Sequence, residues 1–278
     1  MREGPAPTGA TRLAGVIGWP VRHSRSPHIH NAAYRATGLD WVYVALPVAP
    51  GQVEAALAGV RALGIEGLSV TMPHKAAAAA AVDALTDDAV ALRAVNSIRR
   101  DGDRLVGDNT DGGGFVDSLL EAGVDVDGRR CAVLGAGGAA RAVVRALARA
   151  GASSVVVLNR DAERARAAAA LAGPVGSVGA LGDDGALASA DLLVQATPVG
   201  MGDDPTLALD PAPLPGHAVV ADLVYHPRRT PLLAAAEARG LQTVGGLGML
   251  VHQAARQFEA WTGQAAPIDA MRAAADAP

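Results

Sequence analysis

The sequence predicts an α/β protein that contains two α/β domains with mostly parallel sheets. Short apolar segments of strand length alternate with helix-length segments along most of the chain, and this alternation is typical of parallel sheets with right-handed crossovers. Several strand segments end in Gly- or Pro-rich loops, which in such proteins line a crevice at the carboxyl edge of the sheet. A length of 278 residues allows one large or two modest domains.

The composition excludes several classes of protein. A net charge of −4 and a pI near 6.0, with no basic run, argue against a nucleic-acid partner. No charge-free apolar stretch of 18 residues predicts a membrane span, and the first 11 residues lack the apolar core of a signal peptide. The single cysteine, Cys131, permits no internal disulfide. We therefore expect a cytoplasmic protein with no membrane partner, either monomer or homodimer.

The first half of the chain alternates between strands and helices. Ser26 precedes Pro27, and Ser as N-cap with Pro at the first helical position predicts a helix start. A glycine, Gly64, closes the second helix. The expected strands are residues 12–18, 41–46, 67–70 and two short ones within 98–105, and the expected helices are 26–36, 53–63, one from about residue 76, and 115–121.

The second half continues the alternation after a change in composition at residues 122–130. Residues 183–215 are rich in Gly, Asp and Pro and are expected at the surface. The expected strands are residues 131–134, 154–158, 191–196, 218–224 and 241–245, and the expected helices run from a glycine-rich turn to about residue 150, over 250–262 and over 268–275.

Lys75 is the only lysine in the chain, and the other 23 of the 24 Lys and Arg residues are arginine. An ammonium can lose its proton when it is desolvated, whereas a guanidinium effectively cannot. Lys75 follows a short apolar strand and precedes an alanine-rich helix, where α/β proteins place their sites. It is therefore a candidate acid/base residue, although a lone surface lysine left by chance is the competing interpretation.

Two further segments of the first half hold polar side chains near helix starts. Ser24 and Ser26, two apart in an extended segment, could donate together to an anion, or form a common Ser turn. Asp111 lies in the small-residue run 107–114 before a helix, and could be only its N-cap. The spacing of His23, His28 and His30 does not match a metal-binding helix, so we expect no metal.

The turn at residues 135–140 reads G-x-G-x-x-A between a strand and a helix, with a second strand within about 30 residues. Its first glycine permits the tight turn, its second lets the backbone approach a pyrophosphate, and Ala140 allows close helix packing. This context predicts a Rossmann-like dinucleotide site, against the alternative of a glycine turn without a ligand.

The end of the second strand bears on the choice of dinucleotide. Arg160, with Arg164 one turn later, favours the 2′-phosphate of NADP. Asp161 favours the ribose diol of NAD, so NAD stays possible. Both arginines could also be a solvated helix start.

Six short motifs occur in the order found in shikimate dehydrogenases, and the chain resembles that family along essentially its full length. The motifs are G-x-P-x-x-H-S-x-S-P at residues 18–27, S-V-T-x-P-x-K at 69–75, A-V-N at 94–96, G-D-N-T-D-G at 107–112, G-A-G-G-A at 135–139 and G-G-L-G-M-L-V-x-Q-A at 245–254.

The resemblance implies a role for each matching residue. Ser24 and Ser26 would hold the substrate carboxylate, and Lys75, paired with Asp111, would be the acid/base residue. The ring hydroxyls would be held by Thr71, Asn96, Asp111, Tyr225 and Gln253, with Lys75 also in contact. The pyrophosphate would be held by Gly135, Ala136, Gly137, Gly138 and Ala139, and the 2′-phosphate by Asn159, Arg160 and Arg164. The rest of the cofactor would be approached by Asp87, Thr197, Leu223, Gly246 and Met249. Gln253 could instead be an ordinary surface amide.

The resemblance also implies the reaction and the domain boundaries. The family reduces 3-dehydroshikimate to shikimate with NADPH, in the biosynthesis of chorismate and the aromatic amino acids. Residues 1–110 and 247–278 would form a substrate-binding catalytic domain, and 111–246 an NADP-binding Rossmann-like domain, with the site between them. Asp161 stands where small hydroxyl residues are common, which keeps a quinate/shikimate dehydrogenase using NAD as an alternative. A non-catalytic ligand-binding regulator on the same fold would be expected to lose the Lys75–Asp111 pair.

Overall fold

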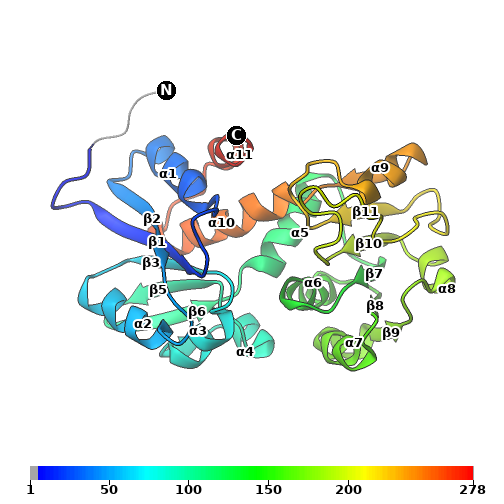
Figure 1. Ribbon diagram of the computed structural model, residues 1–278, viewed down its shortest axis with the longest axis horizontal. Coiled ribbons are helices and arrows are strands. Elements are labelled where there is room, and N and C mark those ends of the chain that lie inside the picture. The colour runs from blue at the N-terminus through cyan, green and yellow to red at the C-terminus, as the bar shows by residue number, and fades with distance from the viewer. Residues whose placement is uncertain (1–5, 278) are drawn as a thin grey trace. The chain divides into compact units, whose positions relative to one another are not determined.

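The computed structural model describes residues 6–277, which form two compact units (Figure 1). The first unit contains the described residues up to Thr110 and those from Gln253 onward, and the second is Asp111–His252. The chain thus passes between units twice, and the second passage lies inside the helix Leu247–Thr262 (α10).

The first unit is built on a six-stranded mixed sheet in the order β2-β1-β3-β5-β6-β4. β1 pairs in parallel with β2 and β3, while β5 runs antiparallel to β3 and β6. The carboxyl ends of β1, β3 and β6 and the amino end of β5 therefore lie at one edge of the sheet. The strands are β1 Arg12–Gly18, β2 Trp41–Pro47, β3 Gly67–Val70, β4 Ala84–Leu85, β5 Ser97–Asp101 and β6 Arg104–Asp108.

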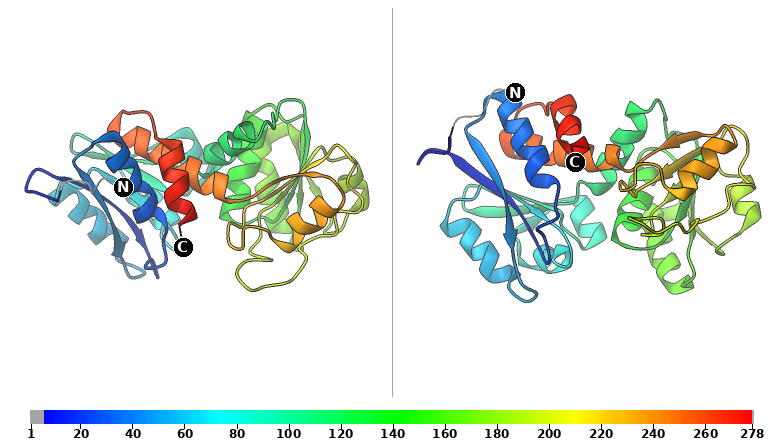
Figure 2. Two further views of the ribbon diagram at one scale, coloured as in Figure 1. Left: turned by 90° about the horizontal axis from the view of Figure 1, so that it is seen from above. Right: turned by 45° about the horizontal axis from the view of Figure 1, so that its top comes forward.

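An aromatic cluster fills one side of this sheet. The ring of His30 stacks on Tyr43 at 4.4 Å and on Trp261 at 5.1 Å between centroids. A Cβ at Gly67 would collide with the Trp261 indole, so a glycine in β3 makes room for this ring. The first and last helices lie side by side in both views of Figure 2. The helices are α1 Ser26–Thr37, α2 Val53–Ala62, α3 Lys75–Ala81, α4 Asp87–Leu92, α11 Ile268–Asp276 and the second part of α10.

The second unit carries a six-stranded sheet that is parallel throughout, in the order β12-β11-β10-β7-β8-β9. Numbered within the unit, this is the 3-2-1-4-5-6 order of dinucleotide-binding folds, and the order reverses between β7 and β10. The strands are β7 Arg130–Leu134, β8 Ser154–Leu158, β9 Gly176–Gly179, β10 Leu192–Gln195, β11 Val219–Asp222 and β12 Gln242–Val244.

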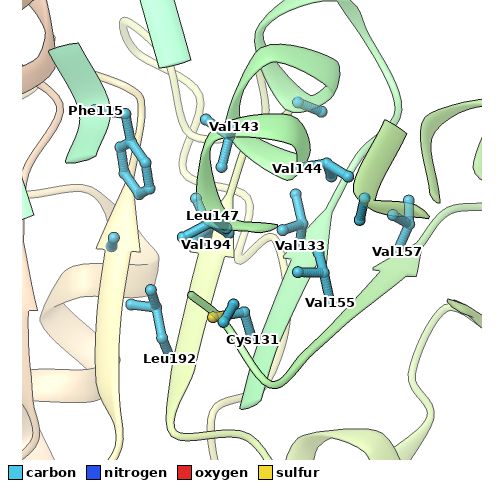
Figure 3. Packing of buried hydrophobic residues seen from close by; sticks show 14 of the residues in the cluster. Phe115, Cys131, Val133, Val143, Val144, Leu147, Val155, Val157, Leu192 and Val194 are labelled. Carbon is cyan, nitrogen blue, oxygen red and sulfur yellow. The ribbon is translucent and has the colours of Figure 1, made fainter. Parts of the chain in front are cut away.

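The core of the second unit consists mainly of Val, Leu and Ala. In Figure 3, side chains of β7, β8 and β10 point toward those of Val143, Val144 and Leu147 on the first helix after β7. Cys131 is buried in this core, and burial raises the pKa of its thiol to about 12. The helices are α5 Asp111–Glu121, α6 Gly138–Arg149, α7 Ala162–Ala169, α8 Asp184–Ala188, α9 Pro231–Ala238 and the first part of α10, with a 3₁₀ segment η1 Ala170–Val175.

The structure confirms the fold class and corrects several helix starts. Ser26 is the first residue of α1 and Arg25 holds the N-cap position without a side-chain bond, so the predicted Ser26 cap is wrong. α5 begins at Asp111, four residues before the predicted start, because Gly112 packs against Ala142 of α6 so closely that a Cβ would meet its carbonyl oxygen at 2.5 Å. α10 begins at Leu247 rather than at residue 250.

Candidate active site

The backbone at one edge of the first sheet gathers the segments that hold Thr71, Lys75 and Asn96. Thr71 N–H donates to Ile17 O at 3.0 Å and Val70 N–H donates to Asn96 O at 2.8 Å. Val95 N–H donates to Lys75 O at 2.9 Å. These residues lie at or just beyond the carboxyl ends of β1 and β3 or precede β5, whose ends share that edge, so segments that are distant in the chain become neighbours.

Lys75 is the first residue of α3 and is half-buried. The turn before it is held by His74, whose N–H donates to Thr71 O at 3.0 Å. The buried His74 ring places Nε2 2.7 Å from Val48 O. These bonds hold the backbone at the start of α3 in a defined position at the sheet edge.

The two serines after β1 bond locally. Ser24 Oγ accepts from Ser26 N–H at 3.3 Å, which is the Ser turn named above as the competing interpretation. The Tyr43 hydroxyl donates to Ser69 Oγ at 2.6 Å, and burial raises the pKa of Tyr43. Both serines are half-buried at the sheet edge that also holds Thr71, so the turn fixes their positions there.

Asn96 and Gln253 belong to one buried hydrogen-bond network. Thr110 N–H donates to Asn96 Oδ1 at 2.8 Å, and Asn96 Nδ2 donates to Thr110 Oγ1 at 3.0 Å. Thr110 Oγ1 donates to Gln253 O at 3.1 Å, and Gln257 Nε2 donates to Gln253 Oε1 at 2.9 Å. Sequence reasoning missed Thr110, Gln257 and Ser69; for Gln257 the available signal is its place one helical turn after Gln253.

In the second unit, the glycine turn is shaped to admit a pyrophosphate. Gly135 has φ +111°, and a Cβ there would lie 3.0 Å from Thr197 Cγ2. Gly137 is the N-cap of α6 with no side-chain bond, and a Cβ at Gly137 or Gly138 would meet nothing within 4 Å. The first amides of α6 thus open onto free space at the carboxyl edge of β7, which suits an anion. The dinucleotide phosphates fit the residues present.

The loop after β8 resolves the role of Asp161. Its carboxylate is the N-cap of α7 and accepts from Glu163 N–H at 3.0 Å and Arg164 N–H at 3.1 Å. Asn159 Nδ2 donates to Asp161 O at 2.9 Å. Arg160 and Arg164 are exposed beside this cap. Capping explains an acidic residue here without a ribose ligand.

Two buried polar side chains hold the loops after β10 and β11. Gln195 Nε2 donates to Thr197 O and Val199 O, both at 3.0 Å, and its Oε1 accepts from Thr197 N–H at 2.6 Å. Asp222 accepts from Val224 N–H at 2.9 Å and from Thr230 Oγ1 at 2.7 Å. Burial raises the pKa of Asp222. Thr197 and the residues after Asp222 are thereby ordered at the same sheet edge as the glycine turn.

The other candidates of the second unit lie on or near this edge. Leu223 and Met249 pack against the core cluster. A Cβ at Gly246 would collide with Leu223 O, which explains the glycine. Tyr225 is 41% exposed and Asp111, at the start of α5, is 8% exposed.

The candidates divide between the two units. Asp87, a cofactor candidate, is the first residue of α4 in the first unit, whereas the glycine turn is in the second. Tyr225 and Asp111 are in the second unit, whereas the remaining substrate candidates are in the first. Within residues 6–277, no three His, Cys, Asp or Glu side chains gather as a metal site. No helix in that range is long and apolar enough to span a membrane.

Comparison with known families gives three matches along the chain. The family described as "Shikimate dehydrogenase substrate binding domain" matches residues 16–98, and "Shikimate / quinate 5-dehydrogenase" matches residues 118–199. The "Shikimate 5'-dehydrogenase C-terminal domain" matches residues 246–275.

Individual relatives agree with these matches. The shikimate dehydrogenase (NADP(+)) of Rhodospirillum rubrum is 50% identical over 96% of this chain and 98% of its own, and that of Symbiobacterium thermophilum is 47% identical over 96% and 94%. The Thermus thermophilus shikimate 5-dehydrogenase, solved in complex with NADP(H) and shikimate, superposes with a TM-score of 0.88 at 37% identity over 95% of this chain and 98% of that one. With such identity along nearly its whole length, the chain belongs to the shikimate dehydrogenase family.

Proposed function

We propose that this protein is an NADP-dependent oxidoreductase that reduces 3-dehydroshikimate to shikimate, a step toward chorismate and the aromatic amino acids. The proposal rests mainly on one observation: backbone hydrogen bonds bring Lys75, the only lysine, beside Asn96 at one edge of the first sheet. The identity to curated NADP(+) enzymes supports it.

The second unit is proposed to hold the cofactor. The amides from Gly135 to Ala139 would bind the pyrophosphate, because a Cβ at Gly137 or Gly138 would meet nothing within 4 Å. Asn159, Arg160 and Arg164 would bind the adenosine 2′-phosphate. When bound, NADPH supplies a hydride. The remaining contacts would come from Asp87, Thr197, Leu223, Gly246 and Met249.

The first unit is proposed to hold most of the substrate. Ser24 and Ser26 would donate to the carboxylate, and Thr71, Asn96 and Gln253 would hold ring hydroxyls. Asp111 and Tyr225 would complete the substrate site. Hydride transfer requires the two bound molecules in contact, so the proposed reaction requires both units. The proposed domain boundaries stay at residues 110/111 and 246/247, six residues before the second passage between the compact units.

Lys75 is proposed to supply the proton of the reaction. As the ketone carbon is reduced, charge develops on its oxygen, and the Lys75 ammonium would stabilise that charge and donate a proton to it. Asp111 would orient Lys75 in this role. An arginine in place of Lys75 would keep the positive charge but not the proton transfer.

A matrix of assays tests the proposed function. The purified protein is offered shikimate or quinate, each with NADP+ or NAD+, and nicotinamide reduction is followed. Turnover of shikimate with NADP+ is the expected result. Preference for quinate or NAD+ would move the protein to the quinate/shikimate dehydrogenase alternative, and no turnover in any combination would favour the regulator.

The proposal also covers the location and the oligomeric state of the protein. A cytoplasmic location is proposed because a chain with one buried cysteine gains nothing from an oxidising compartment. The protein is proposed to act as a monomer or homodimer, which sedimentation of the purified protein distinguishes.

A further inference from the structure

Gln257 is a buried amide whose polar atoms all face other polar groups of the first unit. It lies on α10 one turn after Gln253 and is 1% exposed. Its Nε2 donates to Gln253 Oε1 at 2.9 Å and, at 3.3 Å each, to Asn96 O and Thr110 Oγ1. Its Oε1 accepts from Ser69 Oγ at 2.5 Å. Two of these partners, Asn96 and Gln253, are proposed substrate contacts.

The partners determine which way the Gln257 amide points. Asn96 O is a backbone carbonyl and can only accept, so the atom of Gln257 that faces it must be the nitrogen. A flipped amide would place two oxygens against each other. Oε1 therefore faces Ser69, whose hydroxyl donates to it. Ser69 in turn accepts from the Tyr43 hydroxyl at 2.6 Å, so every donor in this chain of bonds has an acceptor.

The orientation of the Gln257 amide in turn determines the orientation of the Gln253 amide. Because a Gln257 N–H points at the Gln253 side chain, the atom that receives it must be Oε1 of Gln253. With its oxygen turned toward Gln257, the Gln253 amide directs its N–H groups to the other side. Gln253 is half-buried, whereas Gln257, Ser69, Asn96 and Thr110 are buried. The buried residues of the network therefore fix the orientation of the Gln253 amide.

We propose that Gln257 is a positioning residue that orients Gln253 so that Gln253 donates a hydrogen bond to an oxygen of the substrate ring. This rests on the proposed function, which makes Gln253 a substrate contact. Gln257 itself touches no substrate. Its effect is to remove the freedom of the Gln253 amide to flip, so that the donor is in place before the ligand arrives.

A double-mutant cycle tests this role. Gln257→Met keeps the size of the side chain but loses its hydrogen bonds, and Gln253→Met removes the contact that Gln257 orients. Each single variant should raise the shikimate Kd, measured by calorimetry, about tenfold, which is the effect of one lost hydrogen bond. If Gln257 acts through Gln253, Gln257→Met should change the Kd little in the Gln253→Met background. The KM for NADP+ should stay at the wild-type value.

The control is Thr37→Val, which removes a hydrogen-bonding hydroxyl from α1 in the same unit and should leave the shikimate Kd unchanged. If Gln257→Met does not fold, Gln257→Leu replaces it, because leucine is also apolar, is close in size and makes no hydrogen bond to Gln253. Wild-type protein that neither binds nor oxidises shikimate would overturn the proposed function. Wild-type activity together with additive effects of the two substitutions would overturn the positioning role alone.

Discussion

The two sheets of the molecule recognise their proposed ligands in different ways. At the carboxyl edge of the parallel sheet in the second unit, the candidate ligand groups belong mainly to the backbone. They are a glycine turn, the uncapped amides of α6, and loops held by Gln195 and Asp222. At the edge of the mixed sheet in the first unit, the candidate ligand groups are side chains, which include Lys75 and the Asn96–Gln253 network. A dinucleotide phosphate needs close approach and many N–H groups. A polyhydroxylated acid needs donors and acceptors at defined places.

This difference teaches where substitutions should act. In the second unit, the positions most sensitive to substitution should be glycines, where the absence of a side chain is required. In the first unit they are those where a particular functional group must be present. Of the four predictions below, those on Lys75 and on the glycine turn test that contrast, and those on His30 and Asp191 compare the acid sensitivity of the two units. They run from the largest expected effect to the smallest.

Lys75→Ala should lower turnover by ~10²–10⁴-fold, the scale of a lost acid/base group. The shikimate Kd should change far less, since several other side chains are proposed to hold the ring. Steady-state kcat and calorimetric Kd measure the two quantities. Lys75→Arg is the matched variant, and it should be nearly as slow because a guanidinium keeps its proton. Near-normal turnover of either variant would remove Lys75 from the mechanism.

His30 should make the first unit sensitive to mild acid. Burial lowers the pKa of His30 to about 3, and among the described residues neither ring nitrogen has a hydrogen-bond partner. The unfolded chain takes up a proton near pH 6.5 and the folded unit does not, so stability is complete above pH 6.5 and falls as the pH drops toward 3.

The expected slope for His30 approaches about 1.4 kcal/mol per pH unit between roughly pH 6 and 4. Urea unfolding of wild type and of His30→Leu over that range measures it. The variant should lose most of the slope, because leucine does not titrate. Equal slopes in the two proteins would show that His30 is hydrated or paired in solution.

Gly135→Ala and Gly137→Ala should separate folding from cofactor binding. At Gly135, φ of +111° and the nearby Thr197 make a Cβ strained, which costs about 1–3 kcal/mol of stability. At Gly137 a Cβ meets nothing within 4 Å, so Gly137→Ala should melt like wild type yet bind NADP+ more weakly. Thermal melting measures the change in stability, and NADP+ titration measures the change in cofactor affinity. Unchanged NADP+ affinity in Gly137→Ala would argue against a pyrophosphate at this turn.

Asp191 should give the second unit a smaller acid sensitivity at lower pH. Its hydrogen bonds to Arg130, at 2.8 and 3.0 Å, and to His217 hold the pKa of the carboxyl below its usual value of about 3.9. A depressed pKa stabilises the fold above pH 4, and that stability is lost as the pH falls further. Asp191→Asn should cost about 1 kcal/mol at pH 7, measured by urea unfolding, since the pair is partly exposed. An Asp191→Asn variant that matches the free energy of unfolding of wild type at pH 7 but falls below it at pH 3 would contradict this prediction.

Sequence reasoning found the glycine turn and ten of the twelve strands that the structure describes, because their signals are local. It missed the short strands β4 and β9 and the helices α8 and α9. It placed α5 four residues late because three consecutive glycines argue against a helix, and only their close packing on α6 explains them. It missed α4, although Thr86 caps this helix by accepting from Ala89 N–H. The segment of α4 is too short for a helical period to be visible.

The candidate residues that bear functional groups were predicted from motifs, whereas the residues that hold them were not. Ser69 and Gln257 are bonded in the structure but 188 residues apart in the chain. Such a pair has no signature in a single sequence. Asp161 is the reverse case, because its sequence position suggested a ligand and the structure gives it a helix to cap.

The aromatic cluster of the first unit has a spectroscopic consequence. All three tryptophans, Trp19, Trp41 and Trp261, belong to that unit, and the second unit contains none. Intrinsic tryptophan fluorescence therefore reports on the first unit alone, whereas the nicotinamide fluorescence of NADPH would report on the second. A single sample observed at two wavelengths can follow each half of the molecule as it unfolds or binds, without any label.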